Sequence, residues 1–134
     1  MTTATKTARV YLVHVEQDAD LARDIARRLR LTGIDLVPRG KLPRNSIDAS
    51  NQLKRAMDAS DAVLFLITPA ALASDWLVYE HGMAYGLSKL IMIVTAGVQR
   101  KQLPEILQAD RIVPFDRLDD MIQEMTQRFS TEHA

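Results

Sequence analysis

Trp76 and Glu80 are the residues whose types and spacing most clearly suggest chemistry. They lie four residues apart on a helix expected to begin near Ser74, so both side chains project from one helix face. A carboxylate at the edge of a cleft can stabilise positive charge developing on a sugar ring, while an aromatic side chain one turn away excludes water. The alternative is a solvated helix glutamate beside a core tryptophan, and residue types alone leave both interpretations open.

The elements that must position these residues are a strand on each side of the helix. Apolar runs at 62–67 and 90–94 flank it, and the first run breaks at Thr68–Pro69. This order is typical of two parallel strands joined by a helical crossover. The other expected elements are strands at 9–15, 34–37 and 111–115 and helices at 18–31, 46–59, 102–108 and 116–129. Helix ends are expected at four residues: Asp18, Ser46 and Asp116 as N-caps and Gly33 as a C-terminal glycine.

Alternating strands and helices predict an α/β fold. We expect a flavodoxin-like, doubly wound parallel sheet of five strands in the order 2-1-3-4-5, with helices on both faces. Ligands of such sheets bind beyond the carboxyl ends of the strands, where the strand order reverses. His14 ends the first strand and Thr68 follows the third, so both lie at this edge near Glu80. His14 could touch a ligand, or it could be a structural hydrogen-bonding group.

Length and composition limit the function classes. The 134 residues suit one domain, expected at 9–129, with frayed ends at 1–8 and 130–134. Lys plus Arg and Asp plus Glu balance at 17 each, so no global field favours nucleic acid or an anionic membrane. The absence of cysteine excludes disulfides, thiolate metal sites and a cysteine nucleophile. No apolar run approaches the roughly 20 residues of a membrane span, and we expect a cytoplasmic protein.

Several known sites can be excluded by motif. No Walker A or G-x-G-x-x-G motif follows an expected strand, which argues against a conventional phosphate-binding loop. A phospho-accepting receiver domain would need an aspartate and a lysine where Thr68 and Thr95 stand. The three histidines lack the spacing to a carboxylate that a metal-binding helix requires, so we predict no metal.

From Arg9 to about Phe115 the sequence resembles the TIR (Toll/interleukin-1 receptor) domain family, bacterial type. VYLVH resembles the opening strand of the family, GIDLV its second strand, and LPRNSI its BB loop and the start of the next helix. The run ASDAVLFLITPAALASDWLVYE resembles the third strand followed by the Ser-x-Trp-x-x-x-Glu signature. The order of these pieces along the chain makes the resemblance fairly specific.

The resemblance implies an enzyme that cleaves the N-glycosidic bond of NAD, releasing nicotinamide and leaving ADP-ribose or a cyclic isomer. Glu80 would be the catalytic residue, and NAD would be a substrate rather than a cofactor. Trp76 would line the pocket, His14 would lie near the ligand, and Asn45 with Ser46 would lie in the adjoining loop. The family also implies self-assembly that completes the site, contacts with another TIR or effector protein, and a role in bacterial antiviral defence or signalling.

The sequence departs from the family at several positions. Val13 and Val15 stand where the family usually has small hydroxyl residues, which removes possible polar contacts to a ligand. Arg44 and Asn45 replace the usual Gly-Asp of the loop, and Ser88–Lys89 replaces Gly-Lys. These differences affect the expected substrate choice and rate but leave Glu80 in place.

Two other functions remain open at this stage. A non-catalytic TIR adaptor would bind another TIR protein through the BB loop and the following helix. The run Glu80-His-Gly-x-Ala-x-Gly also resembles the glutamate-bearing helix of nucleoside 2-deoxyribosyltransferases, where the carboxylate is a nucleophile. Fold-level analogy cannot choose among these activities.

Overall fold

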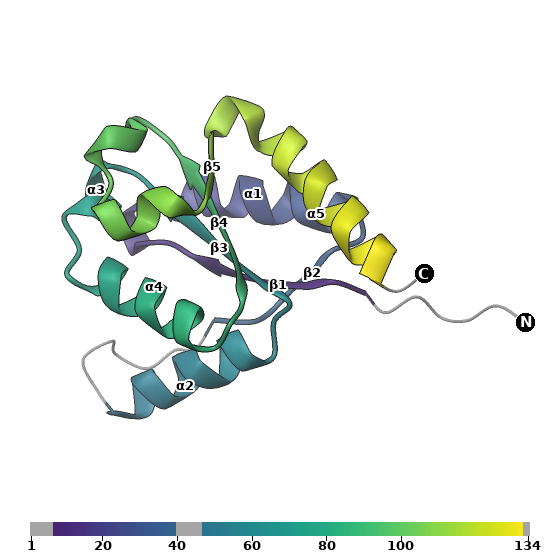
Figure 1. Cartoon of the computed structure of the whole chain (residues 1–134), viewed down its shortest axis with the longest axis horizontal. Coiled ribbons are helices and arrows are strands. Elements are labelled where there is room, and N and C mark those ends of the chain that lie inside the picture. Colours follow the sequence, from purple (N-terminus) through teal and green to yellow (C-terminus); the bar gives the residue numbers. More distant parts are fainter. Residues whose placement is uncertain (1–6, 40–46, 133–134) are drawn as a thin grey trace, which may run out of the picture.

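The computed structural model describes residues 7–39 and 47–132. Its strands are β1 (Arg9–Val13), β2 (Asp35–Leu36), β3 (Ala62–Ile67), β4 (Leu90–Thr95) and β5 (Arg111–Pro114). Its α-helices are α1 (Ala19–Leu31), α2 (Ile47–Asp58), α3 (Pro69–Leu72), α4 (Trp76–Gly86) and α5 (Leu118–Glu132) (Figure 1). Short 3-10 turns are η1 (Glu16–Asp18), η2 (Arg100–Gln102), η3 (Glu105–Ala109) and η4 (Phe115–Arg117).

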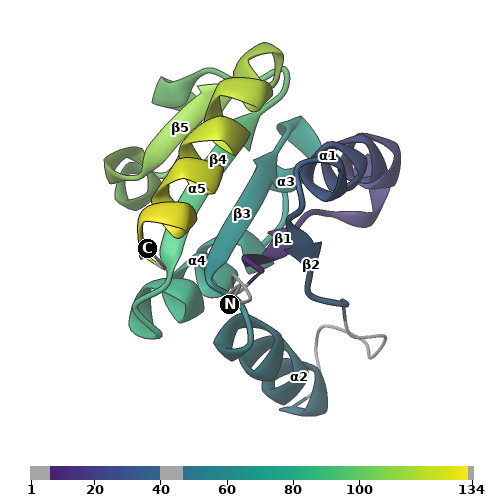
Figure 2. The same ribbon diagram turned by 90° about the vertical axis from the view of Figure 1, so that its right-hand side faces the viewer.

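The five strands form one parallel sheet in the order β2-β1-β3-β4-β5, which confirms the predicted topology. Figure 2 shows the sequence of strands from β5 through β4, β3 and β1 to β2. Strand β3 is central, and all six of its residues are buried. Its register places Val10 of β1 opposite Ala62 and Ile67 opposite Thr95 of β4. A strand covered on both faces needs apolar side chains on both, which explains the uninterrupted run Ala62–Ile67.

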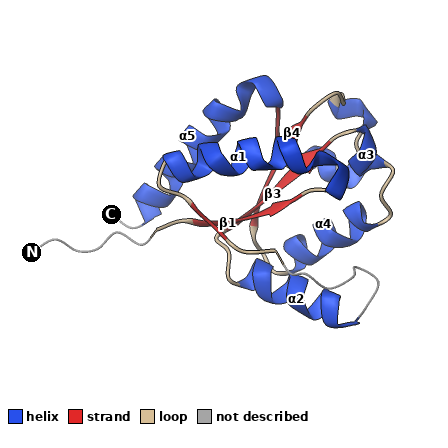
Figure 3. Ribbon diagram, turned by 180° about the vertical axis from the view of Figure 1, so that it is seen from behind, coloured by secondary structure: helices blue, strands red, loops and turns tan. Residues whose placement is uncertain are grey.

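Helices cover the sheet on both faces. The α1 and α5 helices lie on one face and α2, α3 and α4 on the other, as the view from behind shows (Figure 3). Alternate residues of β3 face the two layers: Leu64 and Leu66 pack toward α1 and α5, whereas Phe65 and Ile67 pack toward α2, α3 and α4. Within the described residues, no helix is both long and apolar enough to cross a membrane.

β1 and β2 are shorter than predicted, whereas β3 has the predicted bounds. β1 ends at Val13, because the Val15 carbonyl turns to accept the Asp18 amide of η1 at 3.0 Å. His14 and Val15 therefore lie in a loop rather than in a strand. β2 has two residues, and it cannot extend through Pro38, which has no amide hydrogen for the ladder.

The predicted helix ends are partly wrong. Gly33 ends α1 with a φ of 85°, as expected of a C-terminal glycine. Asp18 occupies the N-cap position of α1, but its side chain makes no capping bond. Asp116 lies inside η4, because a 3-10 turn precedes α5 and delays its start to Leu118. The expected cap Ser46 lies outside the described residues.

Two expected segments also differ in extent. The short helix expected at 102–108, interrupted near Pro104, consists of the two 3-10 turns η2 and η3, and the interruption lies at Leu103 and Pro104 as expected. The last helix, α5, continues to Glu132, beyond residue 129 where it was expected to end. Both differences lie away from the edge of the sheet that carries Glu80.

An ion pair between Arg111 and Glu124 joins β5 to α5 and predicts a pH-dependent contribution to stability. Arg111 donates to both carboxylate oxygens of Glu124, at 3.0 and 2.6 Å. The hydrogen bond from Arg111 holds the pKa of Glu124 below its usual 4.5. The Glu124 carboxyl therefore binds a proton more weakly in the folded state than in the unfolded state. The ion pair stabilises the fold at pH values above the usual pKa of 4.5, and this stabilisation is lost as the pH falls through the lower folded-state pKa.

Both partners are about half exposed, so the effect is small. We expect Glu124→Gln to lower the free energy of unfolding by about 0.2–1 kcal/mol at neutral pH. Urea denaturation at pH 7 and near pH 3 measures this free energy. The difference in stability between Glu124→Gln and the unmodified chain should vanish at the lower pH. An equal difference at both values would contradict this assignment.

Candidate functional site

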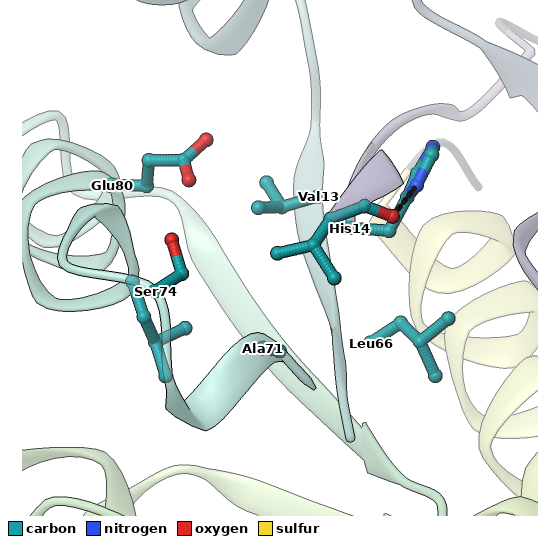
Figure 4. Close-up of a pocket in the computed structure, with 8 residues that line it drawn as sticks. Val13, His14, Leu66, Ala71, Ser74 and Glu80 are labelled. Atoms are coloured by element: carbon teal, nitrogen blue, oxygen red, sulfur yellow. Dashed lines mark hydrogen bonds between the residues drawn. The ribbon is translucent and has the colours of Figure 1, made fainter. Parts of the chain in front are cut away.

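A pocket lies beyond the carboxyl ends of β1 and β3, where the strand order reverses. Its volume is about 220 Å³ including the open mouth. The residues around it come from the β1 loop, β3, α3 and α4, and they are Val13, His14, Val15, Leu66, Ala71, Ser74, Leu77 and Glu80 (Figure 4). This is the position that the doubly wound topology predicts for a ligand.

Glu80 is the buried carboxylate of this pocket. Its side chain is 6% exposed, and it projects from α4 into the space facing Val13 (Figure 4). Leu77 and Ala84, three residues before it and four after it, are also buried, so Glu80 lies on the helix stripe that packs inward. Burying a carboxylate is unfavourable unless it is compensated. A glutamate on an otherwise apolar stripe therefore favours a functional role over a solvated one.

Ser74 places a hydroxyl in the same pocket. Its Oγ accepts the backbone amide of Trp76 at 3.3 Å, which supports the first turn of α4. The Ser-x-Trp-x-x-x-Glu motif thus has a structural basis: Ser74 lies just before α4 and accepts the amide of its first residue, Trp76, and Glu80 lies one turn further along on the side that faces the pocket. Ser74 is not among the site residues predicted from sequence. Its position just before a helix at the ligand-binding edge was the available signal.

His14 lines the pocket from the opposite side. Its Nδ1 donates to the Val15 carbonyl at 2.9 Å, which fixes the proton on Nδ1 because a carbonyl can only accept. Figure 4 shows the ring directed away from Glu80. His14 and Glu80 therefore border one pocket without the imidazole pointing at the carboxylate.

Trp76 is not among the residues that line the pocket. Its ring packs edge-on against Tyr79, with centroids 5.1 Å apart and planes at 81°. Tyr79 in turn donates its hydroxyl to Ser50 of α2 at 2.9 Å. The predicted contact of Trp76 with a ligand stays a prediction. Asn45 and Ser46, the other predicted binding residues, lie outside the described residues.

The pocket wall is largely apolar. Val13 and Val15, the two departures from the family pattern, both belong to it, together with Leu66, Ala71 and Leu77. Electrostatic interactions strengthen where water and polar groups are few, so a carboxylate here acts strongly on a nearby cation. The valines remove hydroxyl contacts but preserve this environment.

A hydrogen bond between Thr68 and Asp18 joins the end of β3 to the start of α1. The Thr68 hydroxyl donates to the Asp18 carboxylate at 2.5 Å and accepts the Ala71 amide at 3.2 Å, capping α3. This explains why Asp18 does not cap its own helix: its carboxylate is bonded to the end of β3.

Replacing Thr68 by valine should disrupt both bonds at almost constant volume. We expect Thr68→Val to lower the free energy of unfolding by about 1–3 kcal/mol, through the lost cap and the half-buried carboxylate left without its donor. Chemical denaturation checks this, with Thr68→Ser as the control that retains the hydroxyl. Equal stability of the valine and serine variants would contradict the assigned bonds.

His81 anchors the helix that carries Glu80. The imidazole is 2% exposed, its Nε2 lies 2.6 Å from Asp110 Oδ2, and its ring centroid lies 5.9 Å from that of Phe65. Among the described residues, its Nδ1 has no hydrogen-bond partner. The contacts of His81 join α4 to β3 and to the residue before β5.

The fold and pocket define a flavodoxin-like α/β domain with a buried carboxylate where the strand order reverses. The sequence model of the TIR domain matches residues 10–129, and the chain belongs to the TIR domain family. This confirms the resemblance that the motifs indicated. A comparison with curated proteins finds no match.

Several solved structures share the fold. The TIR-STING receptor from C. gigas, in complex with 2',3'-cGAMP, aligns with a TM-score of 0.69 and 23% identity over 94% of this chain and 41% of its own. The CMP N-glycosidase BcmB of Clostridium botulinum aligns with a TM-score of 0.61 and 16% identity, over 87% of this chain and 97% of its own. The TIR domains of the activated Roq1 resistosome, which recognises the pathogen effector XopQ, align with a TM-score of 0.55 and 18% identity. The alignment covers 91% of this chain and 80% of the Roq1 chain.

These identities are low, so the likenesses establish the fold. The chain spans about two fifths of the C. gigas receptor, 41% of that chain. One of the similar structures is an enzyme that cleaves an N-glycosidic bond, which bears on the chemistry considered next.

Proposed function

We propose that this TIR domain is an N-glycosidase that cleaves NAD between nicotinamide and ribose, with Glu80 as the catalytic residue. The observation that carries the proposal is the buried carboxylate of Glu80 in an apolar pocket at the ligand-binding edge of the sheet. A negative charge held there is placed to stabilise a cationic sugar.

The proposed reaction begins with the cationic nicotinamide group of NAD. As the bond from ribose C1′ to nitrogen breaks, its electron pair moves to nitrogen and nicotinamide leaves as a neutral molecule. The ribose becomes oxocarbenium-like, and the Glu80 carboxylate lowers its energy without forming a bond. Water then attacks C1′ and releases a proton to give ADP-ribose, or a nitrogen of adenine attacks to give a cyclic isomer. The leaving group needs no protonation, so one carboxylate is sufficient.

The pocket suits part of a dinucleotide. The pocket is open at its mouth and is smaller than a whole dinucleotide. We place the nicotinamide ribose in the pocket and the rest of NAD across its mouth. Asn45, Ser46 and Trp76 stay predicted contacts, as the family resemblance implies. A neighbouring protomer would complete the site, so activity should increase with assembly. Such an enzyme could deplete NAD or make a nucleotide signal in bacterial defence.

A second candidate is cleavage of a pyrimidine mononucleotide. The small pocket favours it, as does the fold shared with a CMP N-glycosidase over 97% of that enzyme's length. Cytosine is a neutral base and a poor leaving group, so this reaction would need a proton donor. Ser74 and His14 are the neighbouring groups that carry protons. NAD is favoured because its reaction requires only the charge that Glu80 provides.

Product analysis separates these functions. The purified chain is incubated with NAD or CMP, at low and high protein concentration and with a crowding agent, and products are separated by chromatography. We expect nicotinamide from NAD, increasing more than linearly with protein concentration. Release of cytosine from CMP without release of nicotinamide from NAD would show that the substrate is the mononucleotide and not NAD. No turnover of either in any assembled state would overturn the enzymatic proposal and favour the adaptor function.

A further inference from the structure

The segments around the pocket carry carboxylates. Glu16 and Asp18 lie in the 3-10 turn that follows the β1 loop, and Asp75 immediately precedes α4. Glu16 and Asp75 are exposed to solvent, whereas Glu80 is buried in the pocket itself. The donor to Asp18 is the hydroxyl of Thr68, which carries no formal charge. The pocket and its surroundings therefore concentrate acidic groups at the ligand-binding edge of the sheet.

The described wall of the pocket contains no lysine or arginine. All of its residues belong to segments 10–22 and 62–86, and neither segment has a basic residue other than histidine. Arg23, which follows the first segment, pairs with Asp20 on α1. The ring of His14 is directed away from Glu80 (Figure 4). A cleft lined by charges of one sign attracts the opposite sign, so this pocket favours cations.

Within the described residues, the helix N-termini at this edge are poor phosphate sites. Phosphates in doubly wound folds bind to amides at a helix N-terminus. The first two amides of α4, of Trp76 and Leu77, already donate to the Oγ and the carbonyl of Ser74, at 3.3 and 3.4 Å. The turn before α1 carries Glu16 and Asp18 at the positive end of the helix dipole. A phosphate would meet bonded amides at one helix and like charges at the other.

We propose that the pocket cleaves nicotinamide riboside, a pyridinium nucleoside without phosphate, and prefers it to nicotinamide mononucleotide. This inference rests on the proposed cleavage of a pyridinium N-glycosidic bond at Glu80. The riboside carries one positive charge, whereas its 5′-phosphate makes the mononucleotide net negative. Val13 and Val15 offer apolar surface to the flat pyridinium ring, and the acidic surroundings attract its charge.

The reaction uses only the groups already assigned to the site. The bond between C1′ and the pyridinium nitrogen breaks, its electron pair moves to nitrogen, and nicotinamide leaves as a neutral molecule. Glu80 stabilises the oxocarbenium-like ribose, and water attacks C1′ and loses a proton to give free ribose. Both products are uncharged, so the negative field that attracts the substrate does not retain them.

The phosphates of NAD must then be bound from outside segments 10–22 and 62–86. This requirement agrees with the proposed placement of most of NAD across the mouth and with a site completed by a neighbouring protomer. A riboside has no phosphate to bind, so it needs only the pocket itself.

Steady-state kinetics with three substrates tests the preference. The purified chain is assayed with nicotinamide riboside, nicotinamide mononucleotide and NAD at about 10 and 150 mM salt, which shortens the Debye length from about 30 to 8 Å. At the lower salt we expect kcat/KM to be at least about tenfold higher for the riboside than for the mononucleotide. Added salt should lower kcat/KM for the riboside and raise it for the mononucleotide, which separates the charge of the phosphate from its size.

Two double variants locate the source of the preference. Glu16→Gln combined with Asp75→Asn removes two exposed charges beside the pocket, and should lower the preference for the riboside about threefold or more. The matched control is Asp35→Asn combined with Asp58→Asn. It removes two exposed charges near the amino ends of β2 and β3, at the opposite edge of the sheet, and should leave the preference unchanged.

The substrates also separate this inference from the proposed function. Cleavage of NAD but not of the riboside would overturn the inference and leave the proposed function in place, and the opposite result would reverse that outcome. Cleavage of neither would overturn both. A mononucleotide that reacts as fast as the riboside, or the same salt response for the two, would show that phosphate is bound at this site and would overturn the inference.

Discussion

Replacing Glu80 by glutamine is expected to reduce NAD cleavage by about 10²- to 10³-fold, the usual effect of removing one electrostatic group from a reaction centre. Glutamine has nearly the shape of glutamate but no negative charge, so it should keep the pocket and lose the stabilisation of the cationic ribose. Steady-state kinetics should show the loss in kcat rather than in KM, since the charge acts mainly as the bond breaks.

Stability provides the second readout for this variant. Glu80 is 6% exposed, and burying a charge is unfavourable. Because glutamine nearly keeps the shape of the side chain, chemical denaturation should show that Glu80→Gln still folds cooperatively although its activity falls. Glu105→Gln, at an exposed position of η3, is the matched control and should leave folding and activity unchanged. Full activity of Glu80→Gln would remove Glu80 from the mechanism.

Replacing Phe65 by alanine is expected to have the largest effect on stability. Phe65 is 0% exposed in the central strand, and deleting a buried phenylalanine side chain lowers the free energy of unfolding by about 3–5 kcal/mol. That is a large part of the roughly 5–15 kcal/mol by which domains are stable. The cavity would also lie against His81, whose ring is 5.9 Å away, and would loosen the helix that carries Glu80.

Chemical denaturation with Phe115→Ala as the control separates burial from residue type. Phe115 is half-buried after β5, with the Arg28 guanidinium 5.3 Å from its ring centre. Its removal should cost about 1 kcal/mol, the central value for point mutations. If the two variants lost the same stability, Phe65 would not have the central packing role assigned to it.

The sheet order and the position of Glu80 could be predicted from sequence because they depend on strong local patterns. The uninterrupted apolar run Ala62–Ile67 requires a strand covered on both faces, and the topology then fixes which edge binds ligands. Glu80 follows from its four-residue spacing to the buried Ala84. Its burial in a pocket agrees with the expectation for an inward-facing acid.

Other details could not be predicted because they depend on contacts that local sequence patterns do not determine. Asp18 has the residue type and position of a helix cap, but Thr68, 50 residues away, donates to its carboxylate instead. Trp76 shares a helix face with Glu80, yet its ring packs against Tyr79, and the wall of the pocket comes from α3 and the β1 loop. Helix periodicity gives the direction of a side chain but not its neighbour.

The most direct test of the central claim is a crystal structure of Glu80→Gln with intact NAD bound. We expect the nicotinamide ribose in the pocket bordered by Val13 and Ser74, with its C1′ within about 3–3.5 Å of the side chain at position 80. A well-ordered NAD whose ribose lies elsewhere, with this pocket empty, would contradict the assignment of Glu80 as the group that stabilises the departing sugar.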